Sequence, residues 1–577
     1  MQYRTSLTLL FFLVFSAFYA RAESVSDANF NTDHFSGSGN CASCHDGMTA
    51  DDGAEVSFRK AWSATMMANS ARDPFWRAKV ASELARHPEL ADQINEKCLR
   101  CHAPMASMEA ELQASTLEAF GNGVFDASHP LHDAAMDGVS CTACHQLQPG
   151  EVEETHSGQF SIDPDSAVAF GPRTNPRRNP MANSSGFTPT HGAHMSDSSV
   201  CASCHTLKTP FVDGDGVVAS TTPDREFPEQ MPYLEWENSD FGPGGSREQS
   251  CQSCHMPRRD GVALSRRPRS LAKRDNVAEH GFLGANTLML EILDRHAIEL
   301  GVPAADFEGS IADSRRFLRE GVALELLSAS IDNGNLDLAV QVINHSGHKF
   351  PTGFPSRRAY LHLTVTDAAG NMVFESGHTN PDGSVVGIAA DDNLTGYEAH
   401  YQTITREDQV QVYEPVMGDT DGKVTYSLLR AANYLKDNRI LPAGFDKSQV
   451  PNDIAVQGVA GSDADFVGGS DTVHYRLPLA ASGALTIRLA LNYQPIGFAF
   501  LQDLLSSGND TVITRFGDYF AQASNKTETV SELEVVIDPL SADNQSVINP
   551  PSSGDQPVVA TDTGSAPGSG MGRMRRR

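Results

Sequence analysis

A single pentapeptide pattern, Cys-x-x-Cys-His, constrains this chain more than any other feature. It occurs five times, at residues 41–45, 98–102, 141–145, 201–205 and 251–255, and it uses all ten cysteines of the 577-residue sequence. Two thiols three positions apart can add to the two vinyl groups of one haem, and the next residue then offers an imidazole to the iron. The sequence therefore predicts five covalently bound c-type haems.

The pattern names the residues that would hold these haems. The attaching cysteines would be Cys41, Cys44, Cys98, Cys101, Cys141, Cys144, Cys201, Cys204, Cys251 and Cys254, and the iron ligands His45, His102, His145, His205 and His255. Zinc is a weaker interpretation, because a zinc ribbon needs two Cys-x-x-Cys knuckles for one metal, and five knuckles do not pair off. A disulfide framework is also weaker, since it gives no reason for a histidine after every second cysteine.

The N-terminus has the pattern of a cleavable signal peptide. Residues 1–4 form a short positive stretch, residues 7–19 are apolar, and residues 20–22 read Ala-Arg-Ala, which suits a cleavage site. The apolar stretch is too short for a spanning helix, and no later stretch is long and apolar enough. We expect export to the periplasm or the cell exterior, with residues 1–22 removed and no transmembrane segment left.

The acidity of the chain limits its partners. The formal net charge is −29 and the pI is near 5.0. Such a charge argues against nucleic acid or an anionic membrane surface as a partner. Redox proteins remain as the expected partners, and the sequence leaves open the donor, the acceptor and any oligomer or larger complex.

Composition and periodicity predict an α+β protein of several parts. All five motifs lie within residues 41–255, which is too little polypeptide per haem for an ordinary apolar core. We therefore predict a mostly helical, loop-rich, haem-packed domain over 23–275, followed by a helical connector over 276–320. An antiparallel β-sandwich is predicted over 321–540, and immunoglobulin-type topology is one arrangement that its strands and turns suggest. Residues 541–577 are rich in Pro, Ser, Gly and Asp, which predicts a disordered tail.

Periodicity also places individual elements. Apolar spacing predicts helices over 58–85, interrupted at Pro74, and over 89–97 and 287–300. Alternation of apolar and polar residues predicts strands over 336–342, 360–365, 486–491 and 533–537. The acidic segments 213–216 and 419–421 could offer oxygen ligands to calcium, but tight turns explain both at least as well.

Several longer segments carry a resemblance to a known family. They are WSATMMANSARDPFW from Trp62, CLRCHAPM from Cys98, DGVSCTACH from Asp137, HMSDSSVCASCHTL from His194, HGFLGAN from His280, NHSGHKFPTGFPSRR from Asn344 and LKDNRILPAGF from Leu435. Together they cover most of residues 40–500. The chain resembles bacterial multihaem cytochromes c that are related to the small tetrahaem carriers and, more distantly, to hydroxylamine oxidoreductase.

The resemblance implies which residues bind the second face of each iron. These distal ligands would be His194, His280 and His348, with His156 and His132 as weaker candidates. A hydrogen-bonded or solvent-exposed role stays open for each of them. Related chains often have histidine where this one has Met66 and Met67, and a methionine there could ligate iron or simply fill the core.

The segment around His348 adds a prediction of its own. Its Gly and Pro content favours an irregular loop, so His348 could reach a haem from the rim of the β domain and hold the two domains together. Lys349, Arg357 and Arg358 would then lie where they can pair with haem propionates.

Electron transfer is the function that these features favour, because an iron bound by protein on both faces only exchanges electrons. No catalytic residue is predicted. One alternative is an oxidoreductase that converts a small nitrogen or sulfur compound at one open haem. Against it, no motif carries Lys in place of its histidine, a substitution that marks the active haem in nitrite-reducing relatives. Another alternative is a subunit of a haem filament or outer-surface conduit.

Overall fold

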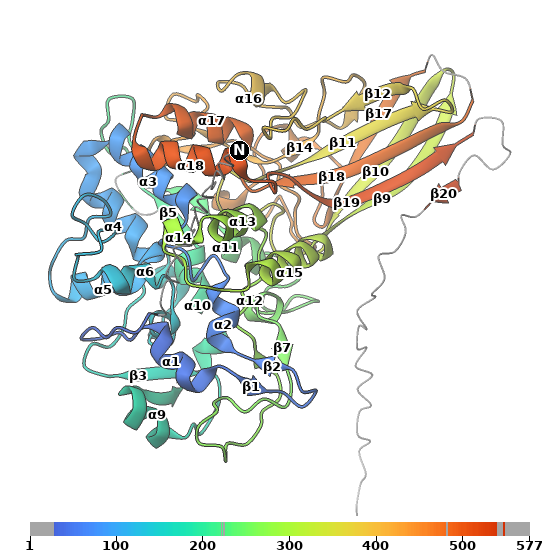
Figure 1. Cartoon of the computed structure of the whole chain (residues 1–577). Helices are drawn as coiled ribbons and strands as arrows, with labels where there is room; N and C mark the ends of the chain where they lie inside the picture. Colours follow the sequence, from blue (N-terminus) through green and yellow to red (C-terminus); the bar gives the residue numbers. More distant parts are fainter. Residues whose placement is uncertain (1–27, 221, 223–224, 480–482, 539–545, 549–577) are drawn as a thin grey trace, which may run out of the picture.

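The computed structural model describes residues 28–220, 222, 225–479, 483–538 and 546–548, and within them the chain is an α+β structure (Figure 1). Helices and loops of the first half lie against two larger sheets formed by the second half (Figure 1). The predicted signal peptide lies outside the described residues, as does most of the predicted tail. Among the described residues no helix is both long enough and apolar enough to span a bilayer.

The first half consists of short helices joined by long loops. They are α1 (Ser38–His45), α2 (Phe58–Ser63), α3 (Pro74–Arg86), α4 (Ala91–His102), α5 (Pro104–Leu112), α6 (His132–Met136), α7 (Cys141–Cys144), α8 (Val152–Thr155), α9 (Arg178–Ser185), α10 (Ser199–His205), α11 (Pro232–Glu237), α12 (Cys251–His255), α13 (Thr287–Arg295), α14 (Ala297–Leu300) and α15 (Phe307–Glu320). Four pairs of short strands support the loops: β1 (Met48–Thr49) with β2 (Glu55–Val56), β3 (Val168–Gly171) with β4 (Thr188–His191), β5 (Leu207–Thr209) with β6 (Phe227–Gln230), and β7 (Arg258–Arg259) with β8 (Val277–Ala278). We call residues 28–320 the motif region.

The predicted helix over 58–85 is two helices with ten residues of turns between them. Helix α2 ends at Ser63, and α3 begins at Pro74, where the Asp73 side chain accepts hydrogen bonds from the backbone of Phe75 and Trp76. The Asn69 amide stabilises the intervening turns by donating to the carbonyls of Ser63 and Thr65. The helices predicted over 89–97 and 287–300 correspond to α4 and to the pair α13 and α14, so these predictions of helix are confirmed.

Two antiparallel-rich sheets make up most of the second half. One has the order β13 (Thr403–Ile404), β17 (Ser470–Pro478), β10 (Asn335–Asn344), β9 (Val322–Asp332). The other has the order β12 (Met372–Ser376), β11 (Arg358–Asp367), β18 (Leu485–Gln494), β19 (Glu528–Ile537), β20 (Ser546–Ile548), with β14 (Val412–Tyr413) also paired to β11. A smaller pair joins β15 (Pro415–Gly418) to β16 (Asn433–Asp437). All four predicted strands are confirmed, as β10, β11, β18 and β19.

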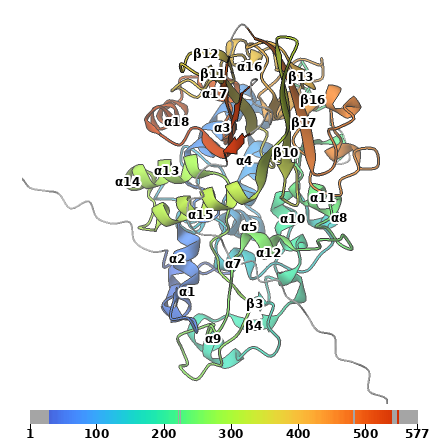
Figure 2. The same ribbon diagram turned by 90° about the vertical axis from the view of Figure 1, so that its right-hand side faces the viewer.

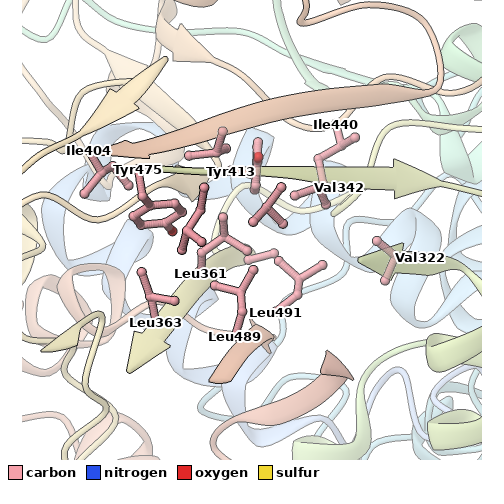
Figure 3. Close-up of a cluster of buried hydrophobic side chains, with 14 of the residues drawn as sticks. Val322, Val342, Leu361, Leu363, Ile404, Tyr413, Ile440, Tyr475, Leu489 and Leu491 are labelled. Carbon is pink, nitrogen blue, oxygen red and sulfur yellow. The ribbon is translucent and has the colours of Figure 1, made fainter. Parts of the chain in front are cut away.

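The faces of the two larger sheets share one hydrophobic core (Figure 3). Figure 3 shows Leu361 and Leu363 of β11 beside Leu489 and Leu491 of β18, with Tyr475 of β17 across from them. Each of these five side chains is at most 1% exposed. The alternation of apolar and polar residues in the sequence is therefore what builds this core. We call residues 321–538 the two-sheet region, and its classification as an immunoglobulin-type sandwich stays a prediction.

Turn chemistry sets the register of the longest hairpin. Strands β9 and β10 are joined by Asn333 and Gly334, which both have positive φ values, of 49° and 77°. An Asn-Gly pair with this geometry gives the tight turn that matches the twist of neighbouring strands.

A second core, which was not predicted from the sequence, joins the two regions. Helices α17 (Phe498–Ser506) and α18 (Thr511–Gln522) lie between β18 and β19 in the chain and pack against α3 and α13. Figure 2 shows α3, α17 and α18 gathered beside the sheets. Phe75 of α3 contacts the rings of Phe500 and Phe516 at centroid distances of 6.0 and 5.4 Å. The motif region and the two-sheet region therefore share buried apolar surface.

Candidate haem-binding sites

Each Cys-x-x-Cys-His motif lies on a short helix. The motif helices are α1, α4, α7, α10 and α12, with the motif histidine at or directly after the last helical residue. Residues three apart lie on the same face of a helix, so the two thiols of a motif point in the same direction. A helix thus presents two sulfurs and one imidazole together. A single c-type haem requires these groups, the sulfurs for attachment and the imidazole as an iron ligand.

The five motif helices are neighbours, although the first and last motif cysteines, Cys41 and Cys254, are 213 positions apart in the chain. The Cys41 thiol lies close enough to Cys141 for that thiol to shift its pKa, and the same is true of Cys101 beside Cys204 and of Cys201 beside Cys251. These three contacts join the first motif to the third, the second to the fourth, and the fourth to the fifth. The Cys144 thiol also lies close enough to Cys201 to raise its pKa, which links the third motif to the fourth.

The ten cysteines form no disulfide bond with one another. All ten lie in the described part of the chain, and each is at least partly exposed. Burial nevertheless raises the pKa of Cys144 to about 11. The two groups of histidine and carboxylate side chains that could hold a metal ion within the described residues contain no cysteine. Neither a disulfide framework nor a cysteine zinc site gains support from these observations.

Four of the five motif histidines use Nδ1 to hydrogen-bond a backbone carbonyl. The pairs are His45 with Leu264 at 2.8 Å, His102 with Ser70 at 3.1 Å, His145 with Phe170 at 2.5 Å and His255 with Leu283 at 2.6 Å. An N–H at Nδ1 leaves the lone pair on Nε2, and a carbonyl partner fixes the ring orientation in the way that metal-binding histidines need. These four imidazoles are therefore set to bind a metal through Nε2.

Two motif histidines face a second histidine. The ring centroids of His145 and His280 are 6.3 Å apart with an interplanar angle of 26°, and those of His255 and His348 are 6.2 Å apart at 21°. A metal bound by two imidazoles holds their centroids roughly 6 Å apart, because each bond is about 2 Å long and the nitrogen lies about 1 Å from its ring centre. Both pairs therefore fit the two axial ligands of one iron.

Burial keeps these imidazoles neutral. It lowers the pKa of His255 to about 4, and together with the nearby His145 it lowers the pKa of His280 to about 3. The pKa of His348 is lowered as well, again chiefly by burial. A neutral imidazole retains the lone pair that a metal ligand donates.

The other three predicted distal ligands lie near motif helices without facing a motif histidine. The Nε2 atom of His194 is 3.0 Å from the carbonyl of Leu147, and its ring lies beside Phe170. His156 is hydrogen-bonded through Nδ1 to the Ser157 hydroxyl at 2.9 Å. His132 is held through Nδ1 by the Val124 carbonyl at 3.0 Å, so its Nε2 is available. Their roles as ligands stay predictions.

The second motif has an aromatic neighbour that the sequence did not reveal. The Trp76 ring stacks on His102 with a centroid distance of 4.2 Å and an interplanar angle of 3°. Met66 and Met67 are half-buried in the turns before α3, and Met66 packs on the second core. For both, iron ligation and core packing remain the two alternatives. The second motif begins at Cys98, 22 residues after Trp76, and only spatial proximity connects the two, so no local sequence signal could have found this contact.

A buried network of charges fixes the loop that carries His348. The Lys349 ammonium lies 2.6 Å from Asp437, whose carboxylate also accepts from Arg439 at 2.8 Å. Arg439 in turn lies 2.9 Å from Glu235 of α11, and Glu235 accepts hydrogen bonds from the Lys349 backbone and the Thr352 hydroxyl. The four charged side chains are at most 6% exposed. This network ties α11 of the motif region to the loop and to the end of β16.

The same contacts correct the predicted propionate partners. Lys349 forms an ion pair with Asp437, and Arg358 forms a bidentate ion pair with Asp391 at 2.7 and 2.8 Å. The prediction was therefore wrong for both, because carboxylates distant in the sequence already neutralise them. Arg357 remains available, and its charge lowers the pKa of both His205 and His348, whose pKa values burial lowers more.

Two other arginines, Arg72 in a buried position and Arg77 in a half-buried one, fit an anionic group. Arg72 donates to the carbonyls of Gly301 and Ala68, and Arg77 donates to the carbonyl of Ala71 and the sulfur of Met136. Among the described residues neither has a carboxylate within ion-pair distance. Burial lowers the pKa of each to about 10, so both are cationic at neutral pH. A buried cation is costly without a counter-charge, and a haem propionate would provide one.

The candidate calcium sites are tight turns. The Asp213 carboxylate accepts from the backbone of Asp215 and Val217, and the Asp419 carboxylate accepts from the backbone of Asp421 and Lys423. In both turns the carboxylate oxygen already accepts backbone hydrogen bonds, so the turn conformation accounts for these acidic residues without calcium.

Comparison with known proteins gives one similar solved structure. It is the penta-heme cytochrome c552 from Thermochromatium tepidum. The identity is 16% and the TM-score 0.48, over 87% of this chain and 99% of that one. No family model and no curated protein matches the chain.

Proposed function

We propose that this chain is an exported electron-transfer protein that carries five covalently bound c-type haems. The observation that carries the proposal is that two pairs of imidazoles face each other. The ring centroids are 6.3 Å apart in the pair His145 and His280, and 6.2 Å apart in the pair His255 and His348. A c-type haem, when bound, supplies an iron that takes up and releases one electron. The chain's own residues would attach it, set its axial ligands and cover it from water.

Ligands on both faces favour electron transfer over catalysis at the third and fifth motifs. His280 would be the distal ligand of the third haem, and His348 that of the fifth. His194, His156 and His132 are the proposed ligands for the remaining motifs, with the Met66–Met67 pair as an alternative for one of them. Arg72, Arg77 and Arg357 would neutralise propionates in the interior.

The contacts between motif thiols support passage of electrons from one haem to another. Since thiols of neighbouring motifs lie close enough to shift one another's pKa values, the groups attached to them would also be close. Acidity and the N-terminal pattern support a periplasmic or extracellular location, with soluble redox proteins as donor and acceptor.

An oxidoreductase with one open haem remains the second candidate. Among the described residues His45, His102 and His205 have no imidazole facing them at the distance of the other two pairs, so one of these motifs would be the place for a substrate. The visible spectrum of the oxidised protein separates the two functions, because a high-spin band indicates an iron with an open or water-bound face. A conduit or filament subunit would instead be recognised by assembly in size-exclusion chromatography and electron microscopy.

Haem stoichiometry is the first test. Intact mass and a pyridine haemochrome assay on mature protein should give five haems per chain, each attached by two thioethers. Four or fewer in correctly matured protein would contradict the proposal for at least one motif.

Axial ligation is the second test. We expect His348→Ala and His280→Ala each to convert one haem to a high-spin form and to shift one step of a redox titration. The matched control is His345→Ala, because His345 is exposed and belongs to the same loop as His348. An unchanged spectrum and titration in both test variants would exclude these residues as ligands.

A further inference from the structure

We propose that the outer face of the β11–β12 hairpin binds one divalent transition-metal ion through His362, Glu375 and His378. This site lies in the two-sheet region and does not depend on the haem proposal. Imidazole and carboxylate are the donor types that Zn²⁺ takes from proteins.

The three donor atoms already converge on one point. The Glu375 Oε1 atom lies 3.0 Å from Nε2 of His362 and 3.0 Å from Nδ1 of His378. All three ligand atoms lie within 4.8 Å of one another. Two donors on a tetrahedral zinc ion with bonds of about 2.1 Å are roughly 3.4 Å apart, so small side-chain movements would complete the coordination.

Strand register explains why two of these side chains meet. Thr364 of β11 pairs with Glu375 of β12, and Leu363 pairs with Ser376. Since side chains alternate between faces, His362, Thr364 and Glu375 share the face away from the core. His362 and Glu375 are therefore diagonal neighbours across the two strands.

A glycine brings the third side chain to the same face. His378 follows Gly377, which has φ of +82°. A Cβ at Gly377 would lie only 2.3 Å from the Leu361 carbonyl oxygen, so no larger residue fits there. The left-handed turn redirects the chain after β12, and His378 then lies next to Glu375.

The backbone around His378 is also held in place. The His378 carbonyl accepts from the backbone N–H of Val386 at 2.9 Å, and Thr379 forms a bridge with Val385. The ligands would thus lie on a rigid hairpin and need little ordering on binding. The side chains of His362 and His378 are 26% and 52% exposed, which leaves a path for the ion. Three protein ligands leave a fourth position for water.

A second group of possible ligands serves as the internal comparison. His400, Asp463 and Asp471 are also close together, but they are buried. The Gln411 and Asn438 amides both donate to Nδ1 of His400, at 2.8 and 3.0 Å. Nδ1 is therefore an acceptor, and Nε2 carries the proton that faces Asp463 at 3.1 Å. A metal at Nε2 would need the other tautomer, which both amides oppose.

The orientation of these amides is set by their oxygens. The Gln411 oxygen accepts from the Tyr401 backbone at 2.8 Å, and the Asn438 oxygen accepts from the Glu414 backbone at 3.1 Å. The buried group is consequently arranged for a proton, whereas the hairpin group is accessible to an ion.

Isothermal titration of tag-free holoprotein with Zn²⁺ tests the site. We expect one Zn²⁺ per chain, and we expect His362→Ala, His378→Ala or Glu375→Gln to weaken binding at least roughly tenfold. The matched control is His474→Ala, because His474 is also about half exposed but has one carboxylate neighbour, Asp465, at 3.6 Å. The control should bind like the wild type. The haem spectrum of every variant should be unchanged, which verifies folding and separates this test from the haem proposal.

Hydrogen exchange gives a second readout. Zn²⁺ should slow exchange of backbone amides over residues 372–386 in the wild type and not in Glu375→Gln. The proposal is overturned if the wild type binds Zn²⁺ no more tightly than a variant that combines His362→Ala, Glu375→Gln and His378→Ala, or if binding is lost only when His400 is replaced.

Discussion

The motif region and the two-sheet region obtain their interiors in different ways. The main buried cluster of the two-sheet region has 33 apolar residues, of which three are alanine. The corresponding cluster of the motif region has 19, of which eight are alanine. Alanine contributes little apolar area on burial. The two-sheet region can therefore be stabilised by its own side chains, whereas the motif region needs additional apolar surface, which the proposed haems would provide.

The largest expected effect comes from preventing haem attachment. In chain produced without a signal peptide, we expect the motif helices α4, α7, α10 and α12 to lose protection from hydrogen exchange, because their interior has fewer large apolar side chains than the two-sheet core. Strands β10, β11 and β18 should keep most of theirs. Mass spectrometry of exchange, with holoprotein as the control, measures both. Equal protection of the two regions in the apoprotein would remove the distinction between them.

Breaking the charge network between the regions should have the next largest effect. Lys349→Met leaves Asp437 and its neighbours with an unbalanced buried charge, at a cost of about 3–5 kcal/mol in the free energy of unfolding. Urea unfolding measures it. The matched control is Arg488→Met, because the Arg488–Glu534 pair is exposed and should contribute at most about 1 kcal/mol. Similar losses in both variants would show that burial does not set the strength of the network.

Cavity formation in the two-sheet core should be somewhat milder. Leu361→Ala should lower the free energy of unfolding by about 2–5 kcal/mol while leaving the haem spectrum intact. Leu327 of β9 is 52% exposed, so Leu327→Ala should change it by less than about 0.5 kcal/mol. A changed spectrum in Leu361→Ala would mean that the two regions are coupled more tightly than their separate cores suggest.

The smallest expected effect is a pH dependence confined to the two-sheet region. Burial lowers the pKa of His400 from 6.5 to about 4, so the unfolded chain binds more protons than the folded one between these values. Stability should therefore fall as the pH drops from 6.5 to 4, by up to about 3 kcal/mol. His400→Gln should remove that loss.

A neighbouring carboxyl acts in the opposite direction. Burial raises the pKa of Asp471 from 3.8 to about 7, so its contribution is present below 3.8 and is lost as the pH rises to 7. The difference in unfolding free energy between wild type and His400→Gln, measured at each pH, isolates the histidine. A difference that does not vary with pH would exclude His400 as the titrating group.

Local patterns predicted much of this molecule, and distant contacts supplied the rest. The motif helices and strands such as β11 follow from spacing within a few residues. Helices α17 and α18 were missed, although their apolar faces pack against α3, because partners more than 400 residues away are not visible in a local pattern. The same holds for Lys349, whose partner Asp437 comes 88 residues later. What the sequence could not indicate was which charges neutralise one another.

The contacts among motif thiols have a consequence for the proposed flow of electrons. Among the described residues, the thiol neighbours that shift one another's pKa values link the motifs in a branched order, in which the fourth motif lies close to three others through Cys201 and Cys204, and the first, second and fifth motifs are end points. In such an order there is a single route between any two end points, and each of those routes crosses the fourth motif. Disabling the fourth haem would therefore isolate all three ends, whereas disabling any end would leave the other two connected. The fourth motif would then be the junction of the proposed haem arrangement.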